Sequence, residues 1–335
     1  MSGADAGAIT EHRELVREMS RPGGPLAPDA PTSSMRNPDW FYQDTPVPEP
    51  TLERGYLHRR LLTEHLAKFP DARADRQAIV LAGPPGAGKS SVLHRLLEDD
   101  LPGWVVVDAD EFKHALLTQA IADGTYDTKI VPDIVRQAQE AGERFAPLEL
   151  ASLVHEESSL LAARARTAAL RGGLNVVVDT VLSGERSARV LGGQLEQAGY
   201  RVRVVDVETT YEISAARVEQ RWRDVTRAYL ADQNDTGLGG RWVPSEYTRG
   251  LFPAELHGKS VCEGIARTLA EGCGAVDQLA VYRVTDPQSA PRLEATYERP
   301  RRGAPIVDAE TARSLRTMDR TRGARRASRP GDMER

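Results

Sequence analysis

The run Gly83-Pro-Pro-Gly-Ala-Gly-Lys-Ser90 restricts the possible folds of this chain more than any other feature. It matches in full the pattern G-x-x-x-x-G-K-S/T, in which backbone N–H groups surround phosphate oxygens and the next helix directs its positive N-terminus at them. An apolar segment of strand length, residues 77–82, precedes the run, and a helical pattern follows it. The sequence therefore predicts a nucleotide-binding loop, with Lys89 at the β- and γ-phosphates and the Ser90 hydroxyl on Mg²⁺. The residues expected to contact the nucleotide are Gly83, Pro84, Pro85, Gly86, Ala87, Gly88, Lys89, Ser90 and Ser91.

Short valine-rich runs alternate with helical patterns on both sides of this loop. The runs expected to form strands are residues 77–82, 104–108, 175–179, 201–207 and 279–285. The patterns expected to form helices are residues 52–69, 90–97, 133–172, 185–198 and 211–230. Such alternation indicates an α/β domain, and continuous apolar runs suit strands that are buried on both faces. We expect a P-loop nucleoside-triphosphate hydrolase or kinase fold, with a largely parallel sheet and helices on both faces.

The chain divides into three parts of different composition. Residues 1–50 begin with a helical pattern and continue as a proline-rich extension, with eight prolines within residues 21–50. Residues 51–298 hold the expected kinase domain. Residues 299–335 hold eleven Arg against five Asp or Glu and few apolar side chains, so we expect a basic, disordered and solvated tail. The alternative for this tail is weak contact with nucleic acid.

Composition excludes several classes of protein. No apolar run is long enough and free enough of charge to span a membrane, and the first residues lack the apolar stretch of a signal peptide. The two cysteines, Cys262 and Cys273, cannot build a disulfide framework or a zinc ribbon. We therefore expect a cytoplasmic protein without membrane contact.

Acidic side chains follow two of the predicted strands directly. Asp108 and Asp110 come at the end of one strand, and Asp179 ends another. Ligands of parallel sheets bind at the carboxyl ends of the strands, which is also where the phosphate loop lies. We expect Asp110 to take the proton of an acceptor hydroxyl and Asp179 to hold Mg²⁺ together with Ser90. Asp108 either takes part in this chemistry or caps the helix that follows it.

Three arginines are candidates for stabilising the charge that phosphoryl transfer spreads over the moving group. Arg217 and Arg221 lie four residues apart on a predicted helix, and Arg241 follows the glycine-rich stretch of residues 237–240, a candidate hinge. The alternative for each arginine is a surface charge. The chain has no Asn-Lys-x-Asp run, which a GTPase needs to read guanine, so the sequence favours a kinase.

Taken in order, these motifs resemble those of the zeta toxin family of P-loop kinases. The resemblance rests on the phosphate loop, on Asp108-Ala-Asp-Glu-Phe-Lys113, on Asn175-Val-Val-Val-Asp-Thr180, and on the positions of Arg221 and Arg241. It implies ATP or GTP with Mg²⁺, Asp110 as the catalytic base, and the two arginines as phosphate clamps. It also implies transfer of the γ-phosphate to a hydroxyl of UDP-N-acetylglucosamine, by the toxin of a toxin–antitoxin system whose partner is an antitoxin protein.

The resemblance covers residues 55–298. Two departures stand out: the family's Gly between Asp179 and Thr180 is absent, and a glutamate that the family carries in mid-helix falls here on Ala163. Polar side chains earlier on the same helix are expected to contact the acceptor instead. The full set of candidates for acceptor contact is Lys113, His155, Glu156, Ser158 and Thr180. The alternatives to UDP-N-acetylglucosamine are an antibiotic or an NAD-type acceptor, and a nucleotide-binding module that acts through a partner is the alternative to a kinase.

Overall fold

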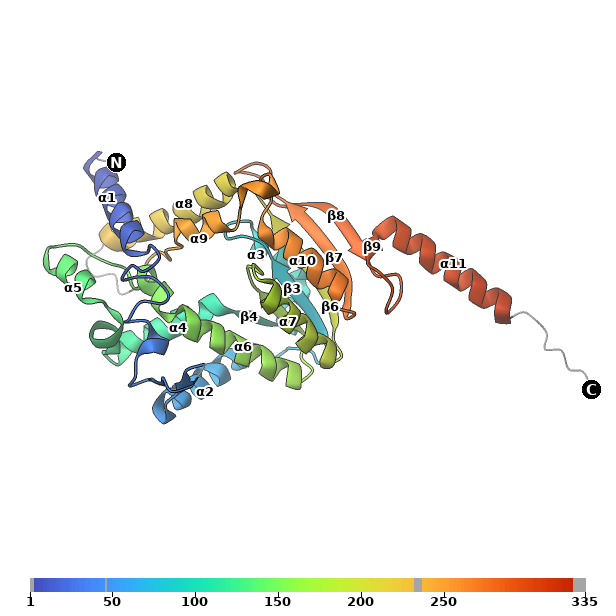
Figure 1. The fold of residues 1–335 in the computed structure, drawn as a ribbon, viewed down its shortest axis with the longest axis horizontal. Coiled ribbons are helices and arrows are strands. Elements are labelled where there is room, and N and C mark those ends of the chain that lie inside the picture. The colour runs from blue at the N-terminus through green and yellow to red at the C-terminus, as the bar shows by residue number, and fades with distance from the viewer. Residues whose placement is uncertain (1–2, 46, 232–236, 328–335) are drawn as a thin grey trace, which may run out of the picture.

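The centre of the molecule is a seven-stranded sheet in the order β4-β5-β3-β6-β7-β8-β9 (Figure 1). The computed structural model describes residues 3–45, 47–231 and 237–327. The strands of the sheet are β3 (Gln77–Ala82), β4 (Val105–Asp108), β5 (Val176–Asp179), β6 (Arg201–Glu208), β7 (Val276–Arg283), β8 (Arg292–Glu298) and β9 (Val307–Asp308). The strands from β4 to β7 run parallel, and β8 and β9 join antiparallel at one edge. The predicted parallel sheet and its five predicted strands are confirmed.

Helices account for most of the remaining described residues. The α-helices are α1 (Gly3–Met19), α2 (Leu52–Ala67), α3 (Lys89–Leu97), α4 (Ala109–Ala122), α5 (Asp133–Glu140), α6 (His155–Arg171), α7 (Glu185–Gln197), α8 (Tyr211–Ala231), α9 (Ser245–Gly250), α10 (Val261–Gly272) and α11 (Ala309–Ala327). A short antiparallel pair, β1 (Phe41–Tyr42) and β2 (Glu49–Pro50), lies outside the main sheet. No helix in the described ranges is both long and apolar enough to span a membrane.

The two faces of the sheet are covered by different helices. Along β3, Ile79 and Leu81 pack with Val92 and Leu93 of α3, whereas Ala78 belongs to the larger core on the other face. That larger core includes apolar residues of α4, α6, α7 and α10, and α7 and α10 lie side by side across this face in Figure 1. Because successive side chains of a strand point to opposite faces, a strand that is apolar throughout needs both layers. The expected helices on both faces are confirmed.

The predicted helix over residues 133–172 is two helices. Gly142 has φ of +103°, a left-handed conformation that lies just after the end of α5. Pro147 then opens a 3₁₀ segment, Pro147–Val154, because it has no N–H for the preceding turn. A helix with a new direction, α6, starts at His155. The sequence predicted a single helix because α5 and α6 each bury one apolar face, so the helical spacing of apolar residues is found on both sides of the break.

The segment after residue 299 differs from the disordered tail that the composition suggested. Arg299 is only 8% exposed, and its guanidinium donates to the carbonyls of Val276, Ala270 and Cys273 at 2.9, 2.7 and 3.1 Å. After this anchor, β9 pairs with β8 and α11 extends away from the sheet (Figure 1). Edge-strand pairing and a buried arginine therefore give structure that apolar content alone does not predict. The last part of the tail lies outside the described residues.

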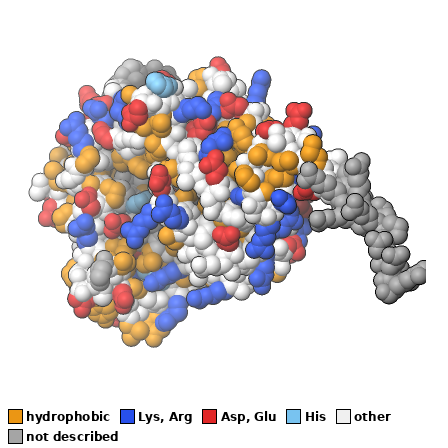
Figure 2. All heavy atoms as spheres, turned by 45° about the vertical axis from the view of Figure 1, so that its right-hand side comes forward, with side chains coloured by type: hydrophobic (Ala, Val, Ile, Leu, Met, Phe, Trp, Pro, Cys, Tyr) orange, Lys and Arg blue, Asp and Glu red, His pale blue; other side chains and the backbone are white. Residues whose placement is uncertain are grey.

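The surface of the body shows no segregation of charge on the face drawn in Figure 2. On the described part of that face, Lys and Arg side chains are interspersed with Asp and Glu. A nucleic-acid site would need basic side chains gathered into a patch or a stripe. This face therefore gives no support to contact of the body with nucleic acid.

A pair of buried carboxyl groups lies at the end of β6, directly behind the phosphate loop. Asp206 and Glu208 are both fully buried, and Ser260, the N-cap of α10, donates to Glu208 at 2.9 Å. Burial raises the pKa of both carboxyls, and the neighbouring charge of Asp206 raises that of Glu208 further. The folded protein therefore holds a proton on this pair more tightly than the unfolded chain does. That contribution to stability is complete at low pH and is lost as the pH rises through the folded-state pKa.

Glu208→Gln should flatten the dependence of stability on pH, because Gln stays neutral and its carbonyl still accepts from Ser260. Between about pH 5 and about pH 9, the melting temperature of the wild type should fall more steeply than that of the variant. The matched control is Glu255→Gln, which changes an exposed carboxylate. Parallel pH profiles for the wild type and Glu208→Gln would contradict the assignment of a protonated pair.

Candidate active site

The phosphate loop has the strand–loop–helix geometry that the motif predicts. It starts at Gly83, whose φ is +125°, and a Cβ there would lie 2.0 Å from the carbonyl oxygen of Val207 on β6. It ends at Gly88, the N-cap of α3, whose φ is +95°. Only glycine accommodates both the left-handed backbone and the close approach of the neighbouring strand. The backbone N–H groups at the start of α3 thus face the space above the sheet, as an anion site requires.

Lys89 is held across the mouth of the loop. Its Nζ donates to the carbonyl of Gly83 at 3.0 Å and lies 3.7 Å from Oδ1 of Asp179. The side chain is 15% exposed. The ammonium is therefore preorganised beside the position where the loop would hold phosphates.

Two carboxylates emerge next to each other at the ends of neighbouring strands. Asp108 of β4 and Asp179 of β5 are paired in the parallel register. Burial raises the pKa of Asp108 to about 6, with the negative charges of Asp110 and Asp179 adding to the effect. Burial also raises the pKa of Asp179, and the Lys89 charge offsets part of that rise. Asp108 caps α4, because its Oδ1 accepts from the Asp110 N–H at 2.9 Å.

Asp110 has the opposite electrostatic environment. One carboxylate oxygen accepts from Lys113 Nζ at 3.0 Å, and the other pairs with the Arg241 guanidinium. Burial alone would raise the pKa of Asp110, but the charges of Lys113 and Arg241 outweigh burial and lower it. Asp110 is therefore ionised at neutral pH and can accept a hydrogen bond from an acceptor hydroxyl.

The residues present fit a magnesium ion. No three His, Cys, Asp or Glu side chains gather as a metal cage within the described ranges. Mg²⁺ is commonly held by one or two protein oxygens together with substrate phosphates and water. The Ser90 hydroxyl at the start of α3 and the Asp179 carboxylate border the same cavity, and together they supply such oxygens.

The loop and the carboxylates border one cavity of about 830 Å³. The predicted residues that line it are Pro84, Pro85, Gly86, Ala87, Gly88, Lys89, Ser90, Ser91, Asp108, Asp110, Lys113, His155, Asp179, Thr180, Arg221 and Arg241. A smaller cavity of about 430 Å³ adjoins it between the loop, α8 and the segment that precedes β8. Ligand sites of proteins commonly have volumes of about 300–1,000 Å³. The structure therefore brings the predicted nucleotide and acid residues to one space.

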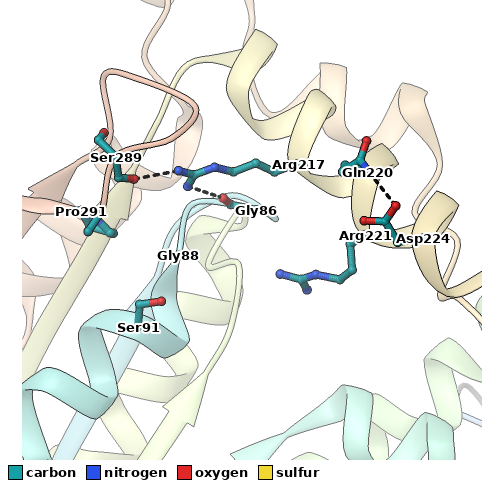
Figure 3. Close-up of a pocket in the computed structure, with 10 residues that line it drawn as sticks. Gly86, Gly88, Ser91, Arg217, Gln220, Arg221, Asp224, Ser289 and Pro291 are labelled. Atoms are coloured by element: carbon teal, nitrogen blue, oxygen red, sulfur yellow. Dashed lines mark hydrogen bonds between the residues drawn. The ribbon is translucent and has the colours of Figure 1, made fainter.

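Arg217 and Arg221 lie one helical turn apart on α8 but differ in their contacts (Figure 3). Arg217 donates to the carbonyls of Gly86 at 3.2 Å, Ser289 at 2.8 Å and Pro287 at 2.9 Å. It joins the phosphate loop to the segment before β8. Arg221 points into the cavity and has no hydrogen bond or ion pair to another described residue. Of the two, Arg221 is the one available to a ligand.

The predicted acceptor residues separate into two groups. Lys113, His155 and Thr180 line the large cavity. Burial lowers the pKa of His155 to about 4, and the charge of Lys113 contributes, so His155 is neutral at pH 7. Ser158 is fully buried and donates to the His155 carbonyl at 2.8 Å, and Glu156 is exposed outside the cavity. The next residue on α6, Ser159, lines the cavity in their place.

Other residues that line the cavity were not predicted. Trp242 and Tyr247 come from the segment around α9, and residues of the N-terminal extension close another side. Burial raises the pKa of Tyr247, so its hydroxyl is a donor at neutral pH. Trp242 and Tyr247 could have been predicted from the sequence, because they closely follow Arg241. The residues of the extension could not, because no motif links them to the loop.

Comparisons with known proteins agree with this fold. A family model described as Zeta toxin matches residues 62–258, more than half of the chain. The chain is also similar to solved structures of an AvrRxo1-ORF1:AvrRxo1-ORF2 complex. The native form has 18% identity and a TM-score of 0.51 over 79% of this chain and 73% of that one. The form with sulphate ions has 16% identity and a TM-score of 0.50, over 80% and 73%.

A structure from the PezAT chromosomal toxin–antitoxin system of Streptococcus pneumoniae is also similar. It has 16% identity and a TM-score of 0.44, over 70% of this chain and 79% of that one. No protein with a curated description matches the chain.

The different contacts of Arg217 and Arg221 predict different effects of their removal. Arg217→Ala should lower the melting temperature, because it removes hydrogen bonds that join the loop to the segment before β8. Arg221→Ala should leave the melting temperature unchanged and lower turnover by about 10²–10³-fold, as for other groups that stabilise a developing negative charge. Thermal melting and a steady-state assay on both variants check this pair. If Arg221→Ala lost as much stability as Arg217→Ala, that result would contradict the finding that the Arg221 guanidinium makes no structural contact.

Proposed function

The chain belongs to the zeta toxin family, and we propose that it is a kinase that transfers the γ-phosphate of ATP or GTP to a hydroxyl of a small molecule. One observation carries the proposal: an ionised aspartate, Asp110, faces the same cavity as a phosphate loop. That aspartate is held by two cations, Lys113 and Arg241. The loop supplies a site for the nucleotide phosphates, and Asp110 supplies a carboxylate that can accept a hydrogen bond from an acceptor hydroxyl. A kinase needs both.

In this proposal the phosphates of the nucleotide lie on the loop. The Lys89 ammonium leaves its hydrogen bond to the Gly83 carbonyl and binds the phosphates instead. Ser90 and Asp179 would hold Mg²⁺, which would neutralise charge on the phosphates when bound. The acceptor hydroxyl donates to Asp110. Its oxygen forms a bond to the γ-phosphorus while the bond from that phosphorus to the nucleoside diphosphate oxygen breaks.

The hydroxyl proton passes to Asp110 and then to solvent. A carboxylate with a lowered pKa is a weak base, but the transition state of phosphoryl transfer is loose and little proton transfer has occurred when it is reached. Orientation of the hydroxyl is then the main contribution of Asp110. Arg221 and Arg241 stabilise the charge on the moving group.

UDP-N-acetylglucosamine is the first acceptor that we propose, and an antitoxin protein is the proposed partner. Both rest on membership of the family. The cavity volume of about 830 Å³ supports an acceptor of this size beside a nucleotide, and the similar AvrRxo1-ORF1 protein was crystallised with a second protein. An antibiotic or an NAD-type molecule is the alternative acceptor for the same chemistry.

Asp110→Asn tests the role of the carboxylate. The change is nearly isosteric, so the affinity for ATP should stay the same or improve slightly, because a negative charge near the phosphates is removed. Turnover should fall by about 10²-fold or more. The control Glu156→Gln removes an exposed carboxylate outside the cavity and should keep normal turnover. Full activity of Asp110→Asn would rule out the proposed base.

Mass spectrometry tests the acceptor. The protein is incubated with ATP and Mg²⁺ and with each of UDP-N-acetylglucosamine, chloramphenicol and NAD. We expect a mass gain of one phosphate on UDP-N-acetylglucosamine, and none with Lys89→Ala. A gain on another member of the panel would correct the acceptor. No gain on any of them, with ATP bound, would favour the nucleotide-binding module that acts through a partner.

A further inference from the structure

The N-terminal extension forms one wall of the large cavity. Ser20, Pro22, Ala27, Pro28 and Asp29 line it together with the phosphate loop and the catalytic carboxylates. The groups assigned to phosphoryl transfer all lie within residues 62–258. The reacting groups therefore lie within the part of the chain that matches the family model, and the wall lies outside that part.

The wall is fixed to the kinase body on both sides. Before it, His12 of α1 is buried and bonds to the buried Glu149 at 3.0 Å, and its ring stacks on Trp222. Within it, Leu26 is fully buried, and its carbonyl accepts from the Ser152 hydroxyl. After it, Phe41 is fully buried next to His58 of α2. A segment anchored at these points presents a preorganised surface to a ligand.

Backbone hydrogen bonds also fix the local shape of the wall. The Leu26 N–H donates to the Met19 carbonyl at 2.9 Å, and the Ala27 and Ala30 N–H groups close successive turns at 3.0 Å. Each turn uses its own amide groups. The side chains of Ala27, Pro28 and Asp29 line the cavity.

Of the carboxylates that line this cavity, Asp29 in the wall and Glu246 of α9 have no hydrogen bond or ion pair to another described residue. The other aspartates that border it are engaged: Asp108 caps α4, Asp110 pairs with two cations, and Asp179 lies near Lys89. Asp29 is exposed to the cavity and has no hydrogen bond or ion pair to another residue in the described ranges. Its neighbours in the wall, Ala27 and Pro28, add apolar surface and no donor.

We propose that residues 20–29 select the acceptor and that Asp29 binds hydrogen-bond donors on its non-reacting part. This inference rests on the proposed kinase function. A carboxylate beside apolar side chains accepts from hydroxyl or ammonium groups and repels phosphate. The acceptor therefore presents a hydroxyl-rich or amino-bearing face to this wall and keeps its anionic groups away from it. A sugar ring has this chemistry.

The test uses the full-length protein with Asp29→Ala and Asp29→Asn, and with Asp44→Asn as a control. Asp44 is exposed in the same extension and does not line the cavity. UDP-N-acetylglucosamine is the probe, or the member of the acceptor panel that the wild type phosphorylates. For each variant, kcat and the KM values for acceptor and ATP are measured, and thermal melting checks the fold.

Asp29→Ala should raise the KM for the acceptor by about 10-fold or more, the range for a hydrogen bond to a charged group. The kcat, the KM for ATP and the melting temperature should stay near the wild-type values. Asp29→Asn shows whether the group that donates to Asp29 is a hydroxyl or an ammonium. For a hydroxyl it should have a smaller effect than Ala, because the amide oxygen still accepts, and for an ammonium it should be as harmful as Ala.

Two outcomes would overturn the inference, and they differ in what else they contradict. If Asp29→Ala and Asp44→Asn both keep the wild-type KM for the acceptor, the wall does not select the acceptor and the kinase proposal stands. If the wild type phosphorylates no acceptor in the panel, the proposed function fails and this inference fails with it.

Discussion

The charge cluster around Asp110 is the interaction on which the rest of the site depends. Asp108, Asp110 and Asp179 crowd one edge of the sheet, and burial disfavours ionisation of all three. Without compensation, like charges so close would leave one or more of them protonated. Lys113 and Arg241 both form ion pairs with Asp110, so the compensation is strongest there. The result is a division of roles, in which Asp110 stays ionised while burial raises the pKa of Asp108 to about 6 and also raises that of Asp179.

Sheet topology explains why this cluster faces a phosphate loop. The loop follows β3, Asp179 follows β5 and Asp108 follows β4, and these three strands are neighbours in parallel order. Parallel strands deliver their carboxyl ends to one edge. Residues of α8, of the segment around α9 and of the N-terminal extension also line the cavity. A protein of this fold can keep the catalytic groups at the edge of the sheet and change the residues that line the rest of the cavity. It can then carry out the same reaction on a different acceptor.

Sequence reasoning located the parts of the site that local chemistry determines. The loop was predictable because its glycines and lysine are fixed by phosphate geometry, and the meeting of Asp108 with Asp179 followed from the ends of parallel strands. The pairing of Arg241 with Asp110 was not predictable as a contact, because 131 residues separate them. The prediction chose Ser158, but Ser159 lines the cavity, because the rotation of α6 about its axis depends on packing. The N-terminal wall contains no motif that would link it to the site. The anchor at Arg299 could not be predicted because it is one arginine among many in a basic segment.

Lys113 and Arg241 keep Asp110 ionised, and the pKa of Asp110 is the most direct measurement of their effect. Carboxyl ¹³C resonances of the protein labelled in aspartate can be followed against pH, with Asp110→Asn identifying the signal. We expect a pKa below the ordinary value for aspartate, and a rise when Arg241 is replaced by Ala, because one of the two compensating charges is then lost. A pKa for Asp110 at or above the ordinary value in the wild type would contradict the account.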